Sequence, residues 1–296
     1  MNEITAEFDD RHQATHHVWS SVDEVILSDD PRARHDVRAE GRLPLESLLV
    51  RRPESRSLVV YLHGSLDRAK YDLPRFERLE SLQHIEANVL FLADPTLYLA
   101  PALRIGWFIG TAEDDVTEHY TQLIRHISDQ LHVEHVVIAG ASSGGYAAIA
   151  LAPRFPDAIS IAWSPQVNVR RFGAAWAEAF RRAAFPEIPT AADLEADPRF
   201  QERVDLAELY RRLPGGKLWY VQNSGDESHV KAQSLPFEDE VGERATFIYE
   251  HHCVGHNPPT VARVRAWIER ALAAPDEDPM EFALTSSANV PDFRYQ

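Results

Sequence analysis

The stretch VVIAGASSGGYAAIA, residues 136–150, decides the fold. An apolar run ends at Ala139, small residues follow, and an alanine-rich segment then resumes with the character of a helix. Ser142 lies in GASSG, residues 140–144, which fits the pattern G-x-S-x-G. A serine held above a parallel sheet needs a sharp strand-to-helix turn, and the residues two before and two after it crowd each other, so both must be small. The pattern, and its position between a strand and a helix, predict a nucleophile at Ser142.

Other interpretations of this glycine-rich turn are weaker. The register Ala141-x-Ser143-x-Gly145 also offers small residues, but the break after Ala139 favours Ser142 as the apex. A dinucleotide site needs G-x-G-x-x-G, which is absent here. A phosphate-binding Walker loop needs a lysine where Tyr146 stands. Glycines that serve packing alone remain an alternative.

Apolar runs alternate with amphipathic stretches over most of the chain. Near-continuous apolar strands separated by helices indicate a mostly parallel sheet covered on both faces, which is an α/β fold. The predicted strands are 45–52, 57–64, 88–94, 135–140, 158–164, 217–225 and 245–252, and the predicted helices are 117–131, 145–155 and 259–274.

The remaining segments suggest one main domain with additions. We expect an N-terminal extension at 1–40, a main domain at 41–273 with a helical cap insert at about 165–213, and a loosely held tail at 274–296. The sequence DEVILS, residues 23–28, suggests a short strand. His12, His16 and His17 are expected on a solvated segment.

A nucleophilic serine needs a base and a residue that orients the base. Asp226 is the first carboxylate after the strand at 217–225, and His256 lies in the loop between the last strand and the closing helix. These positions match the chain order serine, acid, histidine that is expected for a serine on such a turn. Glu227 is the alternative acid. His251 and His252 are weaker candidates for the base because they still belong to the strand end. Cys253 is a weaker candidate for the nucleophile, because a lone cysteine is more often a small apolar residue that fills space.

The histidines near position 256 could also suggest a metal site. No carboxylate or thiolate other than Cys253 stands at a recognised spacing from His251, His252 and His256, so we expect no metal and no cofactor.

When a serine attacks a carbonyl group, the carbonyl oxygen becomes negatively charged, and this oxyanion needs two backbone N–H donors. One should follow the strand that ends in His63-Gly64, where Ser65 and Leu66 offer N–H groups, and the other should open the helix after the serine. We predict the amides of Ser65 and Ser143, and we expect His63 to hold the loop by hydrogen bonds.

These motifs resemble the α/β-hydrolase family over about residues 40–273. The segments that carry the resemblance are LHGS at 62–65, GASSG at 140–144, SGDE at 224–227 and GHNP at 255–258, in the order found in that family. The resemblance implies an eight-stranded, mostly parallel sheet and a triad of Ser142, Asp226 and His256.

Two further segments, 93–111 and 163–169, resemble a branch of the family that includes O-acetyltransferases of accessory secretion systems. The chain lacks the HGGG-type loop of lipases, which argues against a lipase-type substrate.

The predicted reaction is hydrolysis of a small ester, or of an acylated sugar, through an acyl-enzyme. Transfer of the acyl group to a carbohydrate hydroxyl is the alternative, and a non-catalytic binding or scaffold protein is the alternative from another class. Aromatic residues that could line the pocket are Tyr98, Trp107, Trp163 and Trp176, although each could equally pack in the core.

The composition limits the partners. A net charge of −16 argues against nucleic acid and against anionic membrane surfaces. The single cysteine, Cys253, cannot form an internal disulfide, and the polar start MNEITAEFDDRHQATHH lacks the pattern of a signal peptide. No apolar run approaches the ~20 residues of a membrane span. We therefore expect a cytoplasmic protein, and the oligomeric state stays open.

Overall fold

The computed structural model describes residues 7–213 and 216–286. Its centre is a ten-stranded sheet with the order β1-β2-β3-β4-β6-β5-β7-β8-β9-β10. The strands from β6 to β10 run parallel to one another, as their near-continuous apolar sequences predict. The strands are β1 Glu7–Asp9, β2 Ala14–Trp19, β3 Arg32–Val37, β4 Leu45–Val50, β5 Ser57–Leu62, β6 Asn88–Leu92, β7 His135–Ala141, β8 Ile159–Trp163, β9 Lys217–Asn223 and β10 Ala245–Glu250.

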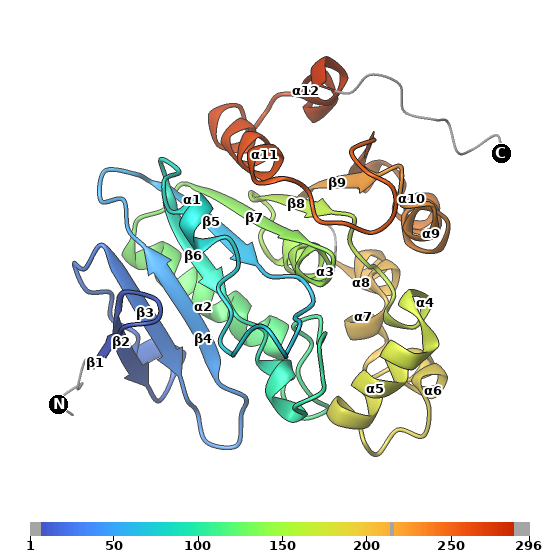
Figure 1. Ribbon diagram of the computed structural model, residues 1–296, viewed down its shortest axis with the longest axis horizontal. Coiled ribbons are helices and arrows are strands. Elements are labelled where there is room, and N and C mark those ends of the chain that lie inside the picture. The colour runs from blue at the N-terminus through green and yellow to red at the C-terminus, as the bar shows by residue number, and fades with distance from the viewer. Residues whose placement is uncertain (1–6, 214–215, 287–296) are drawn as a thin grey trace.

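Helices cover both faces of the sheet (Figure 1). Alternate residues of β5 divide between two cores: Val59 and Tyr61 pack with α1, α11 and α12, whereas Leu58 and Val60 pack with α2 and α3. The helices are α1 Leu79–Leu82, α2 Val116–Gln130, α3 Ser143–Leu151, α4 Val169–Phe172, α5 Ala174–Ala184, α6 Ala191–Ala196, α7 Gln201–Val204, α8 Leu206–Arg212, α9 Glu227–His229, α10 Leu235–Val241, α11 Val261–Ala273 and α12 Pro279–Ser286.

The helices α4 to α8 lie between β8 and β9, where the sequence predicts a helical insert. Their side chains, including Phe180 and Tyr210, share one core with Tyr146 and Ile149 of α3 and with residues of β8, β9 and α10. The insert therefore packs beside the helix that begins at the predicted nucleophile.

The N-terminal histidines are not on a solvated segment, contrary to the sequence-based expectation. β1, β2 and β3 extend the central sheet at one edge (Figure 1), and His12 is buried. Residues 23–28 are also not a strand, because Val22–Glu24 forms a 3-10 helix and Val25–Ser28 has no regular structure.

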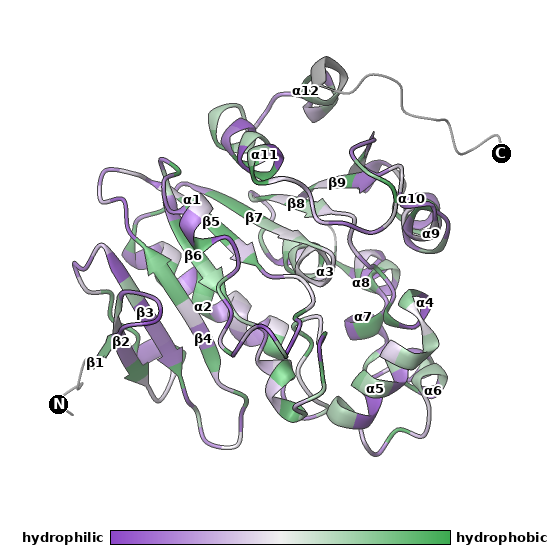
Figure 2. Cartoon of the chain, in the orientation of Figure 1, coloured by the Kyte–Doolittle hydropathy of each residue, from purple (hydrophilic) through white to green (hydrophobic). Residues whose placement is uncertain are grey.

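A buried ionic network explains why these strands escape a search for apolar runs. Arg34 donates to Asp36 at 2.8 and 2.7 Å, to Glu46 at 3.0 Å and to Asp9 at 3.0 Å. In Figure 2, β3 is mostly purple whereas the central strands are mostly green. Paired charges therefore occupy one face of these strands, where a half-buried sheet normally carries apolar side chains.

The segment after α11 is also ordered up to residue 286. Phe282 of α12 packs against Trp267 of α11 with ring centroids 4.6 Å apart, and Lys217 forms an ion pair with Asp276 at 2.7 Å. The loosely held tail that the sequence predicts is therefore contradicted for residues 274–286, and the rest of it lies outside the described residues.

His35 on β3 should make stability depend on pH. Its side chain is fully buried, it accepts a hydrogen bond from Trp19 Nε1 at 3.3 Å, and burial lowers its pKa to about 4. The unfolded chain, with a histidine pKa near 6.5, binds more protons than the folded protein between these two values, so stability is lost as pH falls through this window.

The variant His35→Gln can still accept the hydrogen bond from Trp19 but does not titrate. We expect its free energy of unfolding, measured relative to that of wild type, to be about 2 kcal/mol higher at pH 5 than at pH 8. Urea denaturation of both proteins at the two pH values measures this gain. Wild type must be compared with the variant because Glu46 has an effect of the opposite sign. Burial raises the pKa of Glu46 to about 7, so this residue makes both proteins more stable as pH falls, and its effect cancels in the comparison. An equal change in both proteins would contradict the prediction.

Candidate active site

The turn between β7 and α3 holds Ser142 in a strained backbone conformation, with φ 55° and ψ −119°. A Cβ on Gly140 would lie 2.3 Å from the backbone of Gly144, and a Cβ on Gly144 would lie 2.2 Å from the carbonyl oxygen of Leu62. Neither contact can be relieved by moving a flexible side chain. Both positions therefore require glycine, which is the crowding that the G-x-S-x-G pattern implies.

The structure brings Ser142, His256 and Asp226 together. Ser142 Oγ lies 2.9 Å from His256 Nε2, and His256 Nδ1 lies 2.7 Å from Asp226 Oδ2. Asp226 follows the end of β9, and His256 lies in the loop between β10 and α11. The carboxyl ends of three parallel strands, β7, β9 and β10, thus present the three side chains at one edge of the sheet.

Asp226 stays ionised at this site. Burial raises its pKa, but hydrogen bonds from His229 and His256 outweigh burial and hold the pKa well below its usual range. Ser228 Oγ also donates to Asp226 Oδ1, at 2.9 Å. The carboxylate is therefore an acceptor that can keep an N–H of each histidine pointing toward it.

A second histidine, which the sequence-based reasoning missed, shares this carboxylate. His229 Nδ1 lies 3.0 Å from Asp226 Oδ2, and its ring stacks on that of His256 with centroids 3.9 Å apart and planes inclined by 9°. The signal in the sequence is the spacing: His229 stands three residues after Asp226, and Asp226 caps the short helix α9.

Gln166 is a second residue that sequence reasoning did not identify. It lies in the loop after β8, fully buried, and its Nε2 is 3.0 Å from Ser142 Oγ and 3.0 Å from His229 Nε2. Its Oε1 accepts a hydrogen bond from Trp107 Nε1 at 3.1 Å. An indole N–H can only donate, so this contact fixes which end of the amide faces Trp107.

The loop after β5 leaves one of three consecutive amides without a partner among the described residues. Gly64 N–H donates to Glu77 Oε2 at 3.0 Å, and Leu66 N–H donates to the carbonyl oxygen of Arg104 at 2.7 Å. Leu66, which the sequence analysis considered free, is therefore committed. Ser65 N–H stays available, and so does that of Ser143, because the first residue of a helix has no acceptor one turn earlier.

His63 holds this loop, as expected from the sequence. Its Nδ1 lies 2.7 Å from the carbonyl oxygen of Gly64, and its Nε2 accepts a hydrogen bond from the amide of Asp94 at 2.9 Å. Both ring nitrogens are thus used in fixing the backbone next to Ser65.

Glu77 should hold the amide of Ser65 in place through Gly64. We expect Glu77→Leu to lower kcat on a small ester by about 10- to 100-fold, because losing one oxyanion donor outright costs about 10²–10³. Glu77→Gln keeps an oxygen for the Gly64 amide and should stay within about threefold of wild type. Steady-state kinetics of the two variants test this, and equal losses in both would show that the carboxylate charge matters instead of the hydrogen bond.

No family profile and no curated protein sequence matches this chain. Solved structures do match. A capsule O-acetyltransferase of Neisseria meningitidis serogroup A is 15% identical, with a TM-score of 0.56, and the match covers 80% of this chain and 93% of that one. An S-formylglutathione hydrolase from Agrobacterium tumefaciens is 17% identical, with a TM-score of 0.52 and coverage of 82% and 93%.

A fluorophosphonate-binding serine hydrolase from Staphylococcus aureus, FphF, is 15% identical, with a TM-score of 0.50 and coverage of 83% and 98%. These similar structures, the parallel sheet and the serine turn agree. The chain has the α/β-hydrolase fold. At these identities the likeness establishes the fold alone.

The strand count of this α/β-hydrolase fold differs from the eight strands that the family resemblance implies. The sheet has ten, because β1 and β2 add to the edge next to β3. These extra strands lie away from β7, so they do not contribute to the serine turn.

Two of the aromatic residues expected to line the α/β-hydrolase pocket are buried in the core instead. Trp107 is 0% exposed and Trp163 is 1% exposed, so neither ring can stack on a substrate in this conformation. Tyr98 is 44% exposed, but its hydroxyl donates to Glu46 Oε2 at 2.7 Å, within the N-terminal ionic network. Trp176, which the sequence also suggested, is 38% exposed.

Trp176 lies close to the site through its neighbours. Its ring is 5.9 Å from that of Phe172, which in turn is 5.8 Å from the ring of His229. The guanidinium of Arg104 lies 5.8 Å from the centre of the Trp176 ring. The carbonyl oxygen of Arg104 accepts a hydrogen bond from the amide of Leu66, in the loop that carries Ser65. The cap insert and the loop after β5 therefore meet beside the predicted nucleophile.

The alternative acid and base residues are used elsewhere. Glu227 is exposed and forms an ion pair with Lys231 at 3.1 Å. His251 Nδ1 lies 3.3 Å from Ser224 Oγ, and the amide of His252 donates to Asn223 Oδ1. Asn223 Nδ2 also contacts Cys253 Sγ at 3.3 Å, so these residues shape the loop that carries His256.

Asp226, His229 and His256 could hold a metal ion by spacing, since each offers a ligand atom within 4.8 Å of the others. A ligating nitrogen must be unprotonated. Gln166 Nε2 donates to His229 Nε2, which places the proton of this neutral ring on Nδ1, facing Asp226. A metal on Nδ1 would therefore have to break the contact with Gln166.

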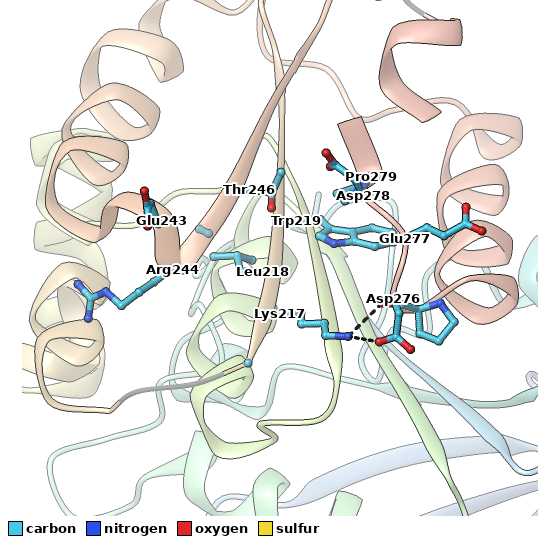
Figure 3. A pocket seen from close by; sticks show the side chains of 13 residues that line it. Lys217, Leu218, Trp219, Glu243, Arg244, Thr246, Asp276, Glu277, Asp278 and Pro279 are labelled. Carbon is cyan, nitrogen blue, oxygen red and sulfur yellow. Dashed lines mark hydrogen bonds and ion pairs between the residues drawn. The ribbon is translucent and has the colours of Figure 1, made fainter. Parts of the chain in front are cut away.

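Figure 3 shows the side chains that line a pocket of about 490 Å³. It is lined by residues at the start of β9 and β10, including Lys217, Trp219 and Thr246, and by 275–279. Asp226 follows the opposite end of β9, so this pocket is not part of the serine site.

Proposed function

We propose that the protein is a serine hydrolase that cleaves a carboxylic ester through an acyl-enzyme. The observation that carries the proposal is the hydrogen-bonded chain from Ser142 Oγ through His256 to Asp226, built on a strained strand-to-helix turn. A strained backbone conformation such as that of Ser142 costs of order 1–3 kcal/mol and is found mostly at functional positions.

In the proposed acylation step, His256 Nε2 takes the hydroxyl proton while Ser142 Oγ attacks the ester carbonyl. The resulting oxyanion accepts hydrogen bonds from the amides of Ser65 and Ser143, and Asp226 stabilises the protonated imidazole. His256 then gives its proton to the departing alcohol, which leaves the acyl group on Ser142. Hydrolysis reverses these roles, with water as the nucleophile and His256 as its base.

Trp176 and Phe172 are the aromatic residues that we propose for substrate contact, in place of Trp107 and Trp163. The contact of Phe172 with His229, the contact of Trp176 with Phe172 and the exposure of Trp176 support this. The nearby guanidinium of Arg104 adds a positive charge to the same rim.

Acyl transfer to a carbohydrate hydroxyl is the second candidate. It is supported by the likeness to a capsule O-acetyltransferase and by the exposed Trp176, since aromatic rings suit sugar stacking. The exposure of His256, 31% for its side chain, favours hydrolysis because water can reach the base.

The experiment is hydrolysis of p-nitrophenyl acetate and p-nitrophenyl octanoate, with and without sugar acceptors, together with labelling by a fluorophosphonate probe. Hydrolysis and labelling of the wild-type protein support the proposal, and acetylated sugar would favour the transferase. A folded protein that is neither labelled nor active would favour a binding or scaffold role.

We further propose small-molecule substrates and a cytoplasmic location. The acidic net charge and the free thiol of Cys253 support these proposals. Within residues 7–213 and 216–286, no helix is both long and apolar enough to cross a membrane.

A further inference from the structure

We propose that Gln166 is a further catalytic residue, a hydrogen-bond donor to Ser142 Oγ, and that His229 and Trp107 are positioning residues that fix this donor. The inference rests on the proposed function and adds a second group, besides His256, that acts on the hydroxyl of Ser142.

The contacts form a closed ring. Ser142 contacts His256, His256 contacts Asp226, Asp226 contacts His229, His229 contacts Gln166, and Gln166 returns to Ser142, with distances between 2.7 and 3.0 Å. Apart from His256, these residues are buried or half-buried, so water competes little for the inner hydrogen bonds.

The direction of every hydrogen bond follows from one anchor. Trp107 Nε1–H can only donate, so Gln166 presents Oε1 to it and both protons of Nε2 to Ser142 and His229. His229 Nε2 is then an acceptor, and its Nδ1–H donates to Asp226. Ser142 Oγ accepts from Gln166 and gives its own proton to His256 Nε2, which is the arrangement needed for attack.

The backbone supports the same assignment. Trp107 and Phe108 both have positive φ, 54° and 59°, a conformation that bulky residues rarely adopt. The Trp107 ring also packs edge-on against Phe172 and Phe180, at 6.1 and 5.3 Å. Strain and packing thus hold a fully buried indole where its N–H meets Gln166.

The hydrogen bond from Gln166 should matter more in deacylation than in acylation. In the free enzyme, Oγ already accepts this hydrogen bond as a hydroxyl, so attack on the ester, which turns Oγ into an ether-like oxygen, gains no extra stabilisation from it. In the acyl-enzyme, Oγ is an ester oxygen and a poor acceptor. When water adds to the acyl carbon and the Oγ–C bond breaks, Oγ gains negative charge, the hydrogen bond strengthens, and Oγ then takes the proton from His256.

The test is Gln166→Met, which keeps the length of the side chain and removes the donor. Stopped-flow kinetics with p-nitrophenyl acetate separate the burst of acylation from steady deacylation. We expect deacylation to slow by about 10- to 100-fold and acylation to change by less than about threefold, so that the acyl-enzyme accumulates. Losses of equal size in both steps, or a larger loss in acylation, would overturn the proposal.

Gln233→Met is the matched control. Gln233 is also buried and holds the same loop, because its Oε1 accepts from the amides of Val167 and Asn168 at 2.9 and 3.1 Å. Within the described part of the chain it makes no hydrogen bond to Ser142. We expect any loss in this variant to affect both steps equally. A selective loss of deacylation in Gln233→Met would overturn the assignment to Gln166.

If Gln166→Met fails to fold, Trp107→Phe keeps an aromatic ring at this position and removes the anchoring N–H. We expect the same selective loss of deacylation in this variant, at a smaller size. A readout independent of turnover is nitrogen-15 NMR of the histidines in the full chain at pH 7. We expect His229 to carry its proton on Nδ1 and none on Nε2. A protonated Nε2 would overturn the proposal even if the protein proves to have no esterase activity, whereas absent activity with the expected tautomer would count against the proposed function alone.

Discussion

Ser142→Ala is expected to lower kcat on p-nitrophenyl acetate by at least about 10⁴-fold and to abolish fluorophosphonate labelling. Removing the nucleophile of a triad leaves only the catalysis that the oxyanion donors and substrate binding provide. The fold should survive, because among the described residues the hydroxyl makes hydrogen bonds only with Gln166 and His256, and the strained backbone is set by Gly140 and Gly144. Circular dichroism and thermal denaturation check that the variant is folded.

The matched control is Ser143→Ala. Ser143 contributes its backbone amide to the proposed oxyanion site, and that amide is unchanged by loss of the hydroxyl. We expect kcat within about threefold of wild type. A large loss in Ser143→Ala with an active Ser142→Ala would assign the nucleophile to the other register of the turn.

Asp226→Asn is expected to lower kcat by about 10⁴-fold. The Nδ1–H groups of His256 and His229 both donate to the same oxygen, Asp226 Oδ2, and the backbone N–H of His229 donates to Oδ1 at 3.3 Å. An asparagine has one oxygen and one NH₂ group, so in either orientation the NH₂ faces an N–H group, and the negative charge that stabilises protonated His256 is lost. A ring of His256 that changes tautomer to avoid this contact is wrongly protonated for catalysis, which costs about 10⁴ in related triads. Steady-state kinetics at saturating ester measure the loss.

Glu227→Gln controls for loss of negative charge at the same turn. Glu227 is the next residue along the chain, is exposed and pairs with Lys231, so the variant should retain wild-type kcat within about twofold. Comparable losses in Asp226→Asn and Glu227→Gln would contradict the assignment of Asp226 as the residue that orients His256.

The central sheet and the serine turn could be predicted because single local rules govern them. Parallel strands covered on both faces must be apolar on both faces, and β5, β7 and β8 follow that rule. The turn at Ser142 admits only small residues, which the contacts of Gly140 and Gly144 explain.

The N-terminal strands could not be predicted in this way. In β2 and β3, histidines, arginine and aspartate occupy positions that apolar side chains usually fill, and their burial depends on partners such as Glu46 and Asp9 that come from other strands. A pattern within one strand carries no information about such pairs.

Gln166 and His229 were missed for a related reason. Neither belongs to a motif with fixed spacing from Ser142, and each gains its role only when the loops after β8 and β9 meet over the serine. The prediction that Trp107 and Trp163 line the pocket was wrong for another reason. The insert buries Trp107, whereas Trp163 packs in a different core, with Trp219 of β9 and Trp267 of α11.

Identification of the acylated residue tests the central claim most directly. The protein is mixed with p-nitrophenyl acetate, quenched in acid during the burst, digested and analysed by tandem mass spectrometry. Our account predicts a single added acetyl group, located on Ser142 and absent from Ser142→Ala. An acetyl group on Ser143, on Cys253 or on a histidine, or no covalent adduct in a protein that turns over the ester, would contradict it.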